Sequence, residues 1–280
     1  MTLDKFISIE KKGVTLVENT LNEIKDKSFQ DYILLLIRAD YDERIARCKS
    51  LGLSPYIIEN REDDYKDFNR QDFMLEYIQR HKSLNTNSQS ISTYEYSEYD
   101  LNIQMMIYTH TWESHLFLKL LERISYLLAG KGYKWQSQLY KCKQKTNFIT
   151  HHIINPIKDF NHNFHTTLTT IYNNHLRNSF SHSDYYINID KEIIHFYDQG
   201  KKYNISFKEW DNIFFTALLL SYYLPANLKT LKNDFIRTHG KNPIKLERPS
   251  FSCPSQKQIF YVVPAYNKLN LETVEFKFYQ

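Results

Sequence analysis

An arginine and a histidine close together in the chain are of the types needed to cleave RNA without a metal ion. Arg177 and His182 are separated by four residues, and Asn178 directly follows the arginine. Histidine has an unperturbed pKa of ~6.5, so it can act as base or acid near neutral pH. Arginine stays cationic and can bind phosphate oxygens bidentately. The pair therefore suits a reaction in which a 2′-hydroxyl loses a proton, a 5′-oxygen leaves and negative charge builds on phosphorus.

The same residues also fit a purely structural role. A cationic side chain near the C-terminus of a helix is favoured by the helix dipole. Arg177 and His182 could then form a helix-end cluster, with His182 as a cap. The spacing alone leaves both interpretations open.

Apolar periodicity predicts that helices position the motif. One helix follows a face that includes Leu101 and Leu120 and ends at Gly130 and Gly132. A second helix opens at Asn155-Pro156, a cap followed by a residue favoured at the first helical position. Its apolar positions continue to Leu176, directly before the motif.

The segment after the motif changes to an alternating pattern. Residues 186–190 and 193–197 predict two short strands around a polar turn. Ser206-x-x-Glu209 is a capping box that predicts a helix from Phe207 to about Leu231. Pro225 is expected to end or kink that helix.

The rest of the chain flanks this centre with less specific patterns. Residues 7–24, 33–47 and 68–78 predict amphipathic helices, and 259–263 and 274–278 look extended. Residues 83–99 are polar and rich in Ser, Asn and Thr, as expected of a linker or surface loop. The predicted fold is mainly α: an N-terminal helical region over 1–99, a helical bundle with a short β-hairpin over 100–240, and a C-terminal extension over 241–280.

The string from Leu176 to Tyr186 resembles the HEPN superfamily, whose ribonuclease members carry Arg-x4–6-His, often with a polar residue after the arginine. A long helix before the motif, a hairpin-like segment after it and a closing apolar helix agree with that family over about residues 100–232. The resemblance implies a metal-independent endoribonuclease active as a dimer that juxtaposes two motifs. Arg177 would bind phosphate and stabilise the transition state, His182 would be the acid–base residue, and Asn178 would make a supporting polar contact.

The resemblance also implies a biological setting, a toxin or phage-defence effector, with an antitoxin or regulatory protein as a possible partner. One subgroup has a tyrosine two residues after the histidine, where its antitoxin modifies it. Here Asp184 occupies that position and Tyr185 follows, so that mode of regulation is not expected. Many domains of this superfamily bind without cutting, and the alternative is a non-catalytic scaffold for a protein or nucleotide ligand.

A lysine-rich stretch before the second helix suits single-stranded RNA. Lys141, Lys143 and Lys145 follow three aromatic residues within the segment 131–145, which holds no acid. Cations can contact phosphates while aromatic rings stack on bases. The alternative is a solvated loop whose aromatics turn inward.

Composition and missing motifs exclude several other classes. The chain of 280 residues has a net charge of only +4, with acids in excess over the first hundred residues and bases in excess after them. The scarcity of Gly (6) and Pro (7) argues against sandwiches, barrels and doubly wound folds. His110-x-x-Glu113-x-His115 lacks the i, i+4 spacing of a helical zinc motif, and no phosphate-binding glycine motif is present, so no metal or cofactor is expected.

The expected compartment is the cytoplasm. No apolar run is long enough to cross a membrane, and the N-terminus does not resemble a signal peptide. Three widely spaced cysteines without a CxxC motif fit a reducing environment.

Overall fold

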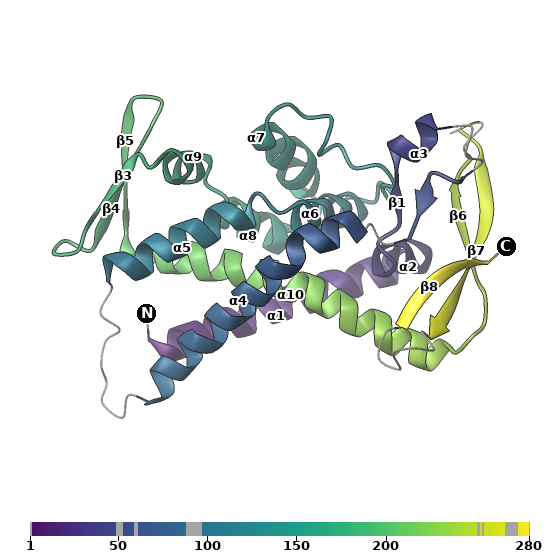
Figure 1. Ribbon diagram of the computed structural model, residues 1–280, viewed down its shortest axis with the longest axis horizontal. Helices are drawn as coiled ribbons and strands as arrows, with labels where there is room; N and C mark the ends of the chain where they lie inside the picture. The colour runs from purple at the N-terminus through teal and green to yellow at the C-terminus, as the bar shows by residue number, and fades with distance from the viewer. Residues whose placement is uncertain are drawn as a thin grey trace.

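The computed structural model describes residues 2–48, 53–58, 61–87, 97–250, 253, 255–266 and 274–279, and it is mainly α-helical. Figure 1 shows the long helices α1, α4 and α10 crossing the middle of the molecule, with a small sheet at each end. The α-helices are α1 (Leu3–Lys27), α2 (Phe29–Leu36), α3 (Glu43–Arg47), α4 (Arg61–Asn87), α5 (Glu98–Thr111), α6 (His115–Leu128), α7 (Lys145–Phe148), α8 (His162–Ile171), α9 (Asn174–His182) and α10 (Phe207–His239). A π-helical turn (Ile149–Ile154) and a 3-10 turn (Asn155–Ile157) follow α7 directly.

The sheets are small and antiparallel. They comprise β1 (Asp40–Tyr41) with β2 (Tyr56–Ile57), then β3 (Tyr185–Asn188), β4 (Ile193–Asp198) and β5 (Lys201–Ser206), and finally β6 (Ile244–Pro249), β7 (Lys257–Tyr266) and β8 (Val274–Tyr279). The extended segments predicted near the C-terminus are confirmed as parts of β7 and β8.

Buried side chains from all three predicted regions share one core. Leu21 of α1, Trp112 after α5 and Val262 of β7 belong to the same cluster of buried residues. Helix α1 packs along α10, because its apolar residues recur on one side of the helix. The N-terminal helices predicted from the sequence are thus built into the centre of the molecule.

The helix predicted to run from Leu101 to Gly130 is wrong as a single element. It breaks at Trp112–Ser114 into α5 and α6. Ser114 caps α6 by accepting the Phe117 N–H at 3.1 Å, and Asp67 of α4 accepts hydrogen bonds from Ser114 Oγ and the Leu116 N–H, both at 3.0 Å. The break therefore depends on a carboxylate distant in sequence, which local periodicity cannot reveal.

The helix predicted from Asn155 to Leu176 is also divided. Asn161 caps α8 by accepting the Phe164 N–H at 2.9 Å, and Asn173 caps α9 by accepting the Leu176 N–H at 3.1 Å. Asparagine competes well for backbone N–H groups at helix starts. The motif consequently lies on a short helix of its own.

The capping box before α10 is confirmed, but Pro225 does not end the helix. Ser206 Oγ accepts the Glu209 N–H at 3.3 Å and the Glu209 carboxylate accepts the Ser206 N–H at 3.0 Å. The helix continues to His239, and Leu228 and Ile236 beyond the proline are buried. Their tertiary packing outweighs the lost hydrogen bond of the proline.

The hairpin predicted after the motif gains a third strand. β3 and β4 correspond to the two predicted strands, and β5 returns through Gln199 and Gly200, whose φ angles are 51° and 74°. Two successive positive φ angles are typical of a tight hairpin turn. Of the predicted linker 83–99, residues 83–87 complete α4, residues 98–99 begin α5, and 88–96 lie outside the described residues.

Among the residues that the structure describes, no helix is both long and apolar enough to cross a membrane.

Candidate functional site around helix α9

Helix α9 carries all three residues of the predicted catalytic set. Arg177 and Asn178 lie near its middle and His182 is its last residue. Ser183 follows with φ 59°, and the Asp184 N–H donates to the Ser179 carbonyl at 2.8 Å. This left-handed residue ends the helix and directs the chain into β3.

Arg177 is held by a glutamate from the break between α5 and α6. Its Nε donates to Glu113 Oε1 at 3.1 Å, and its Nη2 contacts the same oxygen. Lys145 at the start of α7 contacts the other oxygen, Oε2, and also donates to the Glu113 carbonyl at 3.3 Å. We call these three side chains the Arg177 cluster.

The Arg177 cluster is partly open to solvent. Its side chains are 14% (Arg177), 34% (Glu113) and 25% (Lys145) exposed. Partial burial of Glu113 by itself raises the pKa, but hydrogen bonds from Lys145 and Arg177 outweigh it and leave the pKa of Glu113 below its ordinary value. Glu113 therefore remains an anion between two cations.

Helix α4 supports the cluster from a neighbouring position. Arg70 pairs with Asp67, the same carboxylate that fixes the start of α6. Burial lowers the pKa of Arg70, and the nearby Glu113 carboxylate opposes that effect. The break that presents Glu113 to Arg177 is thus fixed by an ion pair from the N-terminal third of the chain.

Arg177 and His182 do not share a face of α9. At ~100° per residue, a separation of five residues places them about 140° apart around the helix axis. Asn178 and His182 are four residues apart and share a face. His182 is exposed and Asn178 is half-buried. The structure therefore places the three motif residues on one helix, but the side chains of Arg177 and His182 do not come together within one chain.

A second histidine on α9 was missed by the sequence analysis. His175 lies seven residues before His182 on the same helix face, and its Nδ1 is 2.7 Å from Asp198 Oδ2 of β4. Its ring also stacks on Tyr203 of β5, with centroids 4.6 Å apart. The seven-residue spacing was a readable signal, but its carboxylate partner appears only once the sheet folds back onto α9.

The three lysines predicted to bind RNA do not form one row. Lys141 and Lys143 are exposed, whereas Lys145 belongs to the Arg177 cluster. Lys141 Nζ donates to Gln136 Oε1 at 2.9 Å. Of the aromatic residues preceding them, Trp135 is buried and Tyr140 is 62% exposed.

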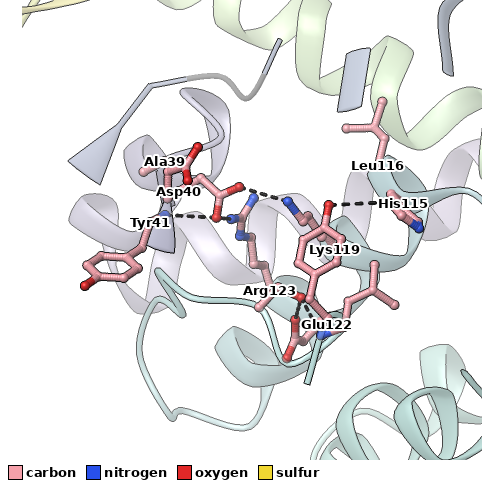
Figure 2. A network of polar contacts seen from close by, with 12 residues as sticks. Ala39, Asp40, Tyr41, His115, Leu116, Lys119, Glu122 and Arg123 are labelled. Atoms are coloured by element: carbon pink, nitrogen blue, oxygen red, sulfur yellow. Dashed lines mark hydrogen bonds and ion pairs between the residues drawn. The ribbon is translucent and has the colours of Figure 1, made fainter. Parts of the chain in front are cut away.

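A second polar centre, which the sequence analysis did not identify, lies where β1 meets α6. Asp40 Oδ2 is 3.0 Å from Lys119 Nζ and its Oδ1 is 2.9 Å from Arg123 Nη2, and each of the three side chains is at most 5% exposed. We call these residues the Asp40 network. Figure 2 shows both cations pointing from α6 toward the Asp40 carboxylate.

Glu122, three residues after Lys119 on α6, extends this polar region. It accepts hydrogen bonds from Ser137 Oγ at 2.5 Å and the Gln138 N–H at 3.1 Å, and it pairs with Lys134 at 3.0 Å (Figure 2 labels Glu122). An adjoining cavity of about 290 Å³ is lined by Asp40, Ser137 and other polar residues. These contacts attach the segment between α6 and α7 to the bundle.

The histidines and cysteines offer no metal centre in the described parts of the chain, where no group of His, Cys, Asp and Glu has a suitable arrangement. In the sequence His110-x-x-Glu113-x-His115, Glu113 binds cationic side chains and His115 Nδ1 lies 3.4 Å from the Tyr140 hydroxyl. Cys48, Cys142 and Cys253 are free thiols.

Comparison of the chain with family models, with curated proteins and with solved structures finds no match.

Proposed function

We propose that the protein is a metal-independent endoribonuclease of HEPN type, active as a dimer with a composite Arg/His site. The observation that carries the proposal is the composition of α9, which presents His182 at an exposed helix end and Arg177 beside a second cation, Lys145. His182 is the acid–base residue, Arg177 binds phosphate and Asn178 makes a supporting polar contact from the His182 face.

Dimerisation is proposed to bring together an arginine and a histidine that lie apart within one chain. Within a chain, Arg177 and His182 diverge by about 140° around the helix axis. A two-fold interface that pairs two copies of α9 brings the histidine of one protomer toward the arginine of its partner. Two histidines then divide the roles of base and acid. Lys141 and Lys143 are proposed to contact the RNA backbone outside this centre.

Glu113 is the main obstacle that a phosphate meets at Arg177. It competes with the substrate for the guanidinium and the ammonium of the Arg177 cluster. RNA binding therefore displaces Glu113 or shares the two cations with it. We propose that such a nuclease acts in the cytoplasm as a toxin or phage-defence effector. An antitoxin or another regulatory protein would control its activity.

The test is cleavage of labelled single-stranded RNA in excess EDTA. Wild type is expected to yield 2′,3′-cyclic phosphate ends, and His182→Ala to lower the rate by about 10²–10⁴-fold, the usual contribution of general acid–base catalysis. Arg177→Ala is expected to be similarly impaired. His162→Ala, which removes another exposed histidine on α8, is the matched control and should cleave like wild type.

A non-catalytic scaffold is the second candidate, and the ion pairs of Arg177 with Glu113 favour it. In that case Arg177 links α9 to the α5–α6 break and has no substrate. Absence of cleavage across several RNAs by folded, dimeric wild type would support the scaffold. Equal cleavage by wild type and both motif variants would reject α9 as the active site.

A further inference from the structure

The sheet that follows α9 has one buried face and one exposed face. Ile194, Phe196 and Ile205 are 0%, 3% and 8% exposed, whereas Tyr186 and Tyr197 are 45% and 38% exposed. Successive residues of a strand point to opposite faces, so the two tyrosines lie on the side away from the bundle. Figure 1 shows the sheet standing at one end of the molecule, beside α5 and α9.

The exposed side has an ordered set of rings and polar groups, which we call the outer face: Tyr186, His195, Tyr197, Lys202 and Asn204. Tyr186 lies opposite His195, and their rings stack with centroids 4.3 Å apart and planes 23° apart. Asn204, opposite His195 on β5, has its Oδ1 2.5 Å from His195 Nδ1. Lys202 Nζ is 5.7 Å from the Tyr186 ring centre and 5.9 Å from that of Tyr197.

The outer face begins where α9 ends. The Tyr197 N–H donates to the Asp184 carbonyl at 2.8 Å, and Asp184 is two residues beyond His182. Ser179 Oγ of α9 donates to the Tyr197 carbonyl at 2.6 Å. The row of Tyr186 and His195 is two residues farther along the strands, about 7 Å away. A chain bound along the outer face therefore leads toward the His182 end of α9.

We propose that the outer face binds the bases of single-stranded RNA by stacking and leads the strand to His182. The inference rests on the proposed ribonuclease function, for which it names a substrate-binding surface. Aromatic rings stack on any base, and the Lys202 ammonium attracts the phosphates between them.

The chemistry of the outer face favours RNA over a protein partner. Interfaces between proteins are enriched in aromatic residues, but their core is depleted of charged residues. Here an ammonium, an amide and an imidazole lie among the rings. Lys202 is also the only charged residue among the five that define the face.

The experiment measures binding of short, fluorescein-labelled polyuridine by anisotropy, with His182→Ala in the full-length chain as the parent so that RNA stays intact. Adding Tyr186→Ala and Tyr197→Ala together is expected to weaken binding about tenfold or more, in line with the contribution of base–aromatic stacking. Tyr186→Trp should retain affinity because it keeps a ring. Tyr261→Ala is the control, since Tyr261 is 41% exposed on a different sheet.

A second measurement does not depend on how the variants fold. Photo-crosslinking of the parent to RNA containing 4-thiouridine should label peptides from residues 186–204. Crosslinks confined to other segments, or no RNA binding by the parent, would overturn the inference, as would equal affinities of the double-tyrosine variant and the Tyr261→Ala control. If RNA binding depends on the tyrosines while the chain with native His182 cleaves no RNA, that result would support the inference about the outer face and reject the proposed nuclease activity. If the tyrosine variants cleave subsaturating RNA as fast as wild type, the nuclease proposal stands and the inference about the outer face is overturned.

Discussion

The Asp40 network and the Arg177 cluster have the same charge composition in different surroundings. Each places a carboxylate between an arginine and a lysine: Asp40, Arg123 and Lys119 in the network, Glu113, Arg177 and Lys145 in the cluster. The network is at most 5% exposed, whereas the cluster is 14–34% exposed. Burial, and not the residue types, thus separates an internal polar link from a cluster that solvent can reach.

The physical difference is desolvation. A charge deep in the protein has lost its water, so it depends on its partners, and removal of one partner leaves an uncompensated ion. In a partly exposed cluster, water and salt can replace a missing partner. The same substitution should therefore have very different costs at the two places.

The largest expected effect follows Asp40→Asn. The change leaves Lys119 and Arg123 without their shared carboxylate, and breaking a buried ion pair typically costs about 3–5 kcal/mol. Urea denaturation should show a matching fall in the free energy of unfolding, with RNA cleavage by the remaining folded protein unchanged. The control is Glu43→Gln, because Glu43 is 46% exposed and lies in the same part of the molecule. A loss no larger than that of the control would contradict the argument from burial.

Asp40 also shows what the sequence could not provide. Its partners on α6 are about eighty residues away, and α6 reads as an apolar helix whose Lys119 and Arg123 would be assigned to solvent. Pairing over such a distance follows from the tertiary fold. No local pattern marks a buried lysine as different from an exposed one.

Local signals were reliable where the chemistry is local. The capping box at Ser206 and Glu209 operates within four residues, and it is confirmed. The alternation after the motif likewise predicted β3 and β4. The breaks at Ser114 and Asn173 were missed because apolar periodicity continues across them and hides the caps.

The candidate site likewise combines residues that the sequence reveals with residues that only the tertiary fold reveals. Arg177, Asn178 and His182 could be selected from the sequence because motif spacing is visible there. Glu113 and Asp198, which bind Arg177 and His175, could not be assigned because they come from other elements.

An intermediate effect is expected for Glu113→Gln, which removes the carboxylate of the partly exposed Arg177 cluster. Loss of the carboxylate charge should lower the free energy of unfolding by about 1 kcal/mol at neutral pH, since exposure screens the pairs. Affinity for single-stranded RNA should rise, because Arg177 and Lys145 no longer hold a competing anion. Glu98→Gln, at the start of α5, is the charge-matched control. A fall in RNA affinity would indicate that Glu113 positions Arg177 and does not compete with phosphate.

The stability difference between wild type and Glu113→Gln should depend on pH in a defined direction. The pKa of Glu113 is lower in the folded protein than its ordinary value of 4.5. A lowered carboxyl pKa contributes stability that is present above the unfolded pKa and lost as the pH falls through the folded one. Wild type should therefore be more stable than Glu113→Gln at neutral pH and lose that advantage at acidic pH below about 4.5. A constant difference across this range would exclude ionised Glu113 as its source.

The smallest effect should appear on adding salt. From about 0.01 M to 1 M ionic strength, the screening length falls from ~30 Å to ~3 Å. The stability difference between wild type and Glu113→Gln should shrink by a few tenths of a kcal/mol, because the Arg177 cluster is accessible to counterions. The difference between wild type and Asp40→Asn should change less, because the side chains of the Asp40 network are at most 5% exposed. Parallel urea titrations at both ionic strengths measure these changes, and an equal salt response at the two places would mean that burial does not separate them.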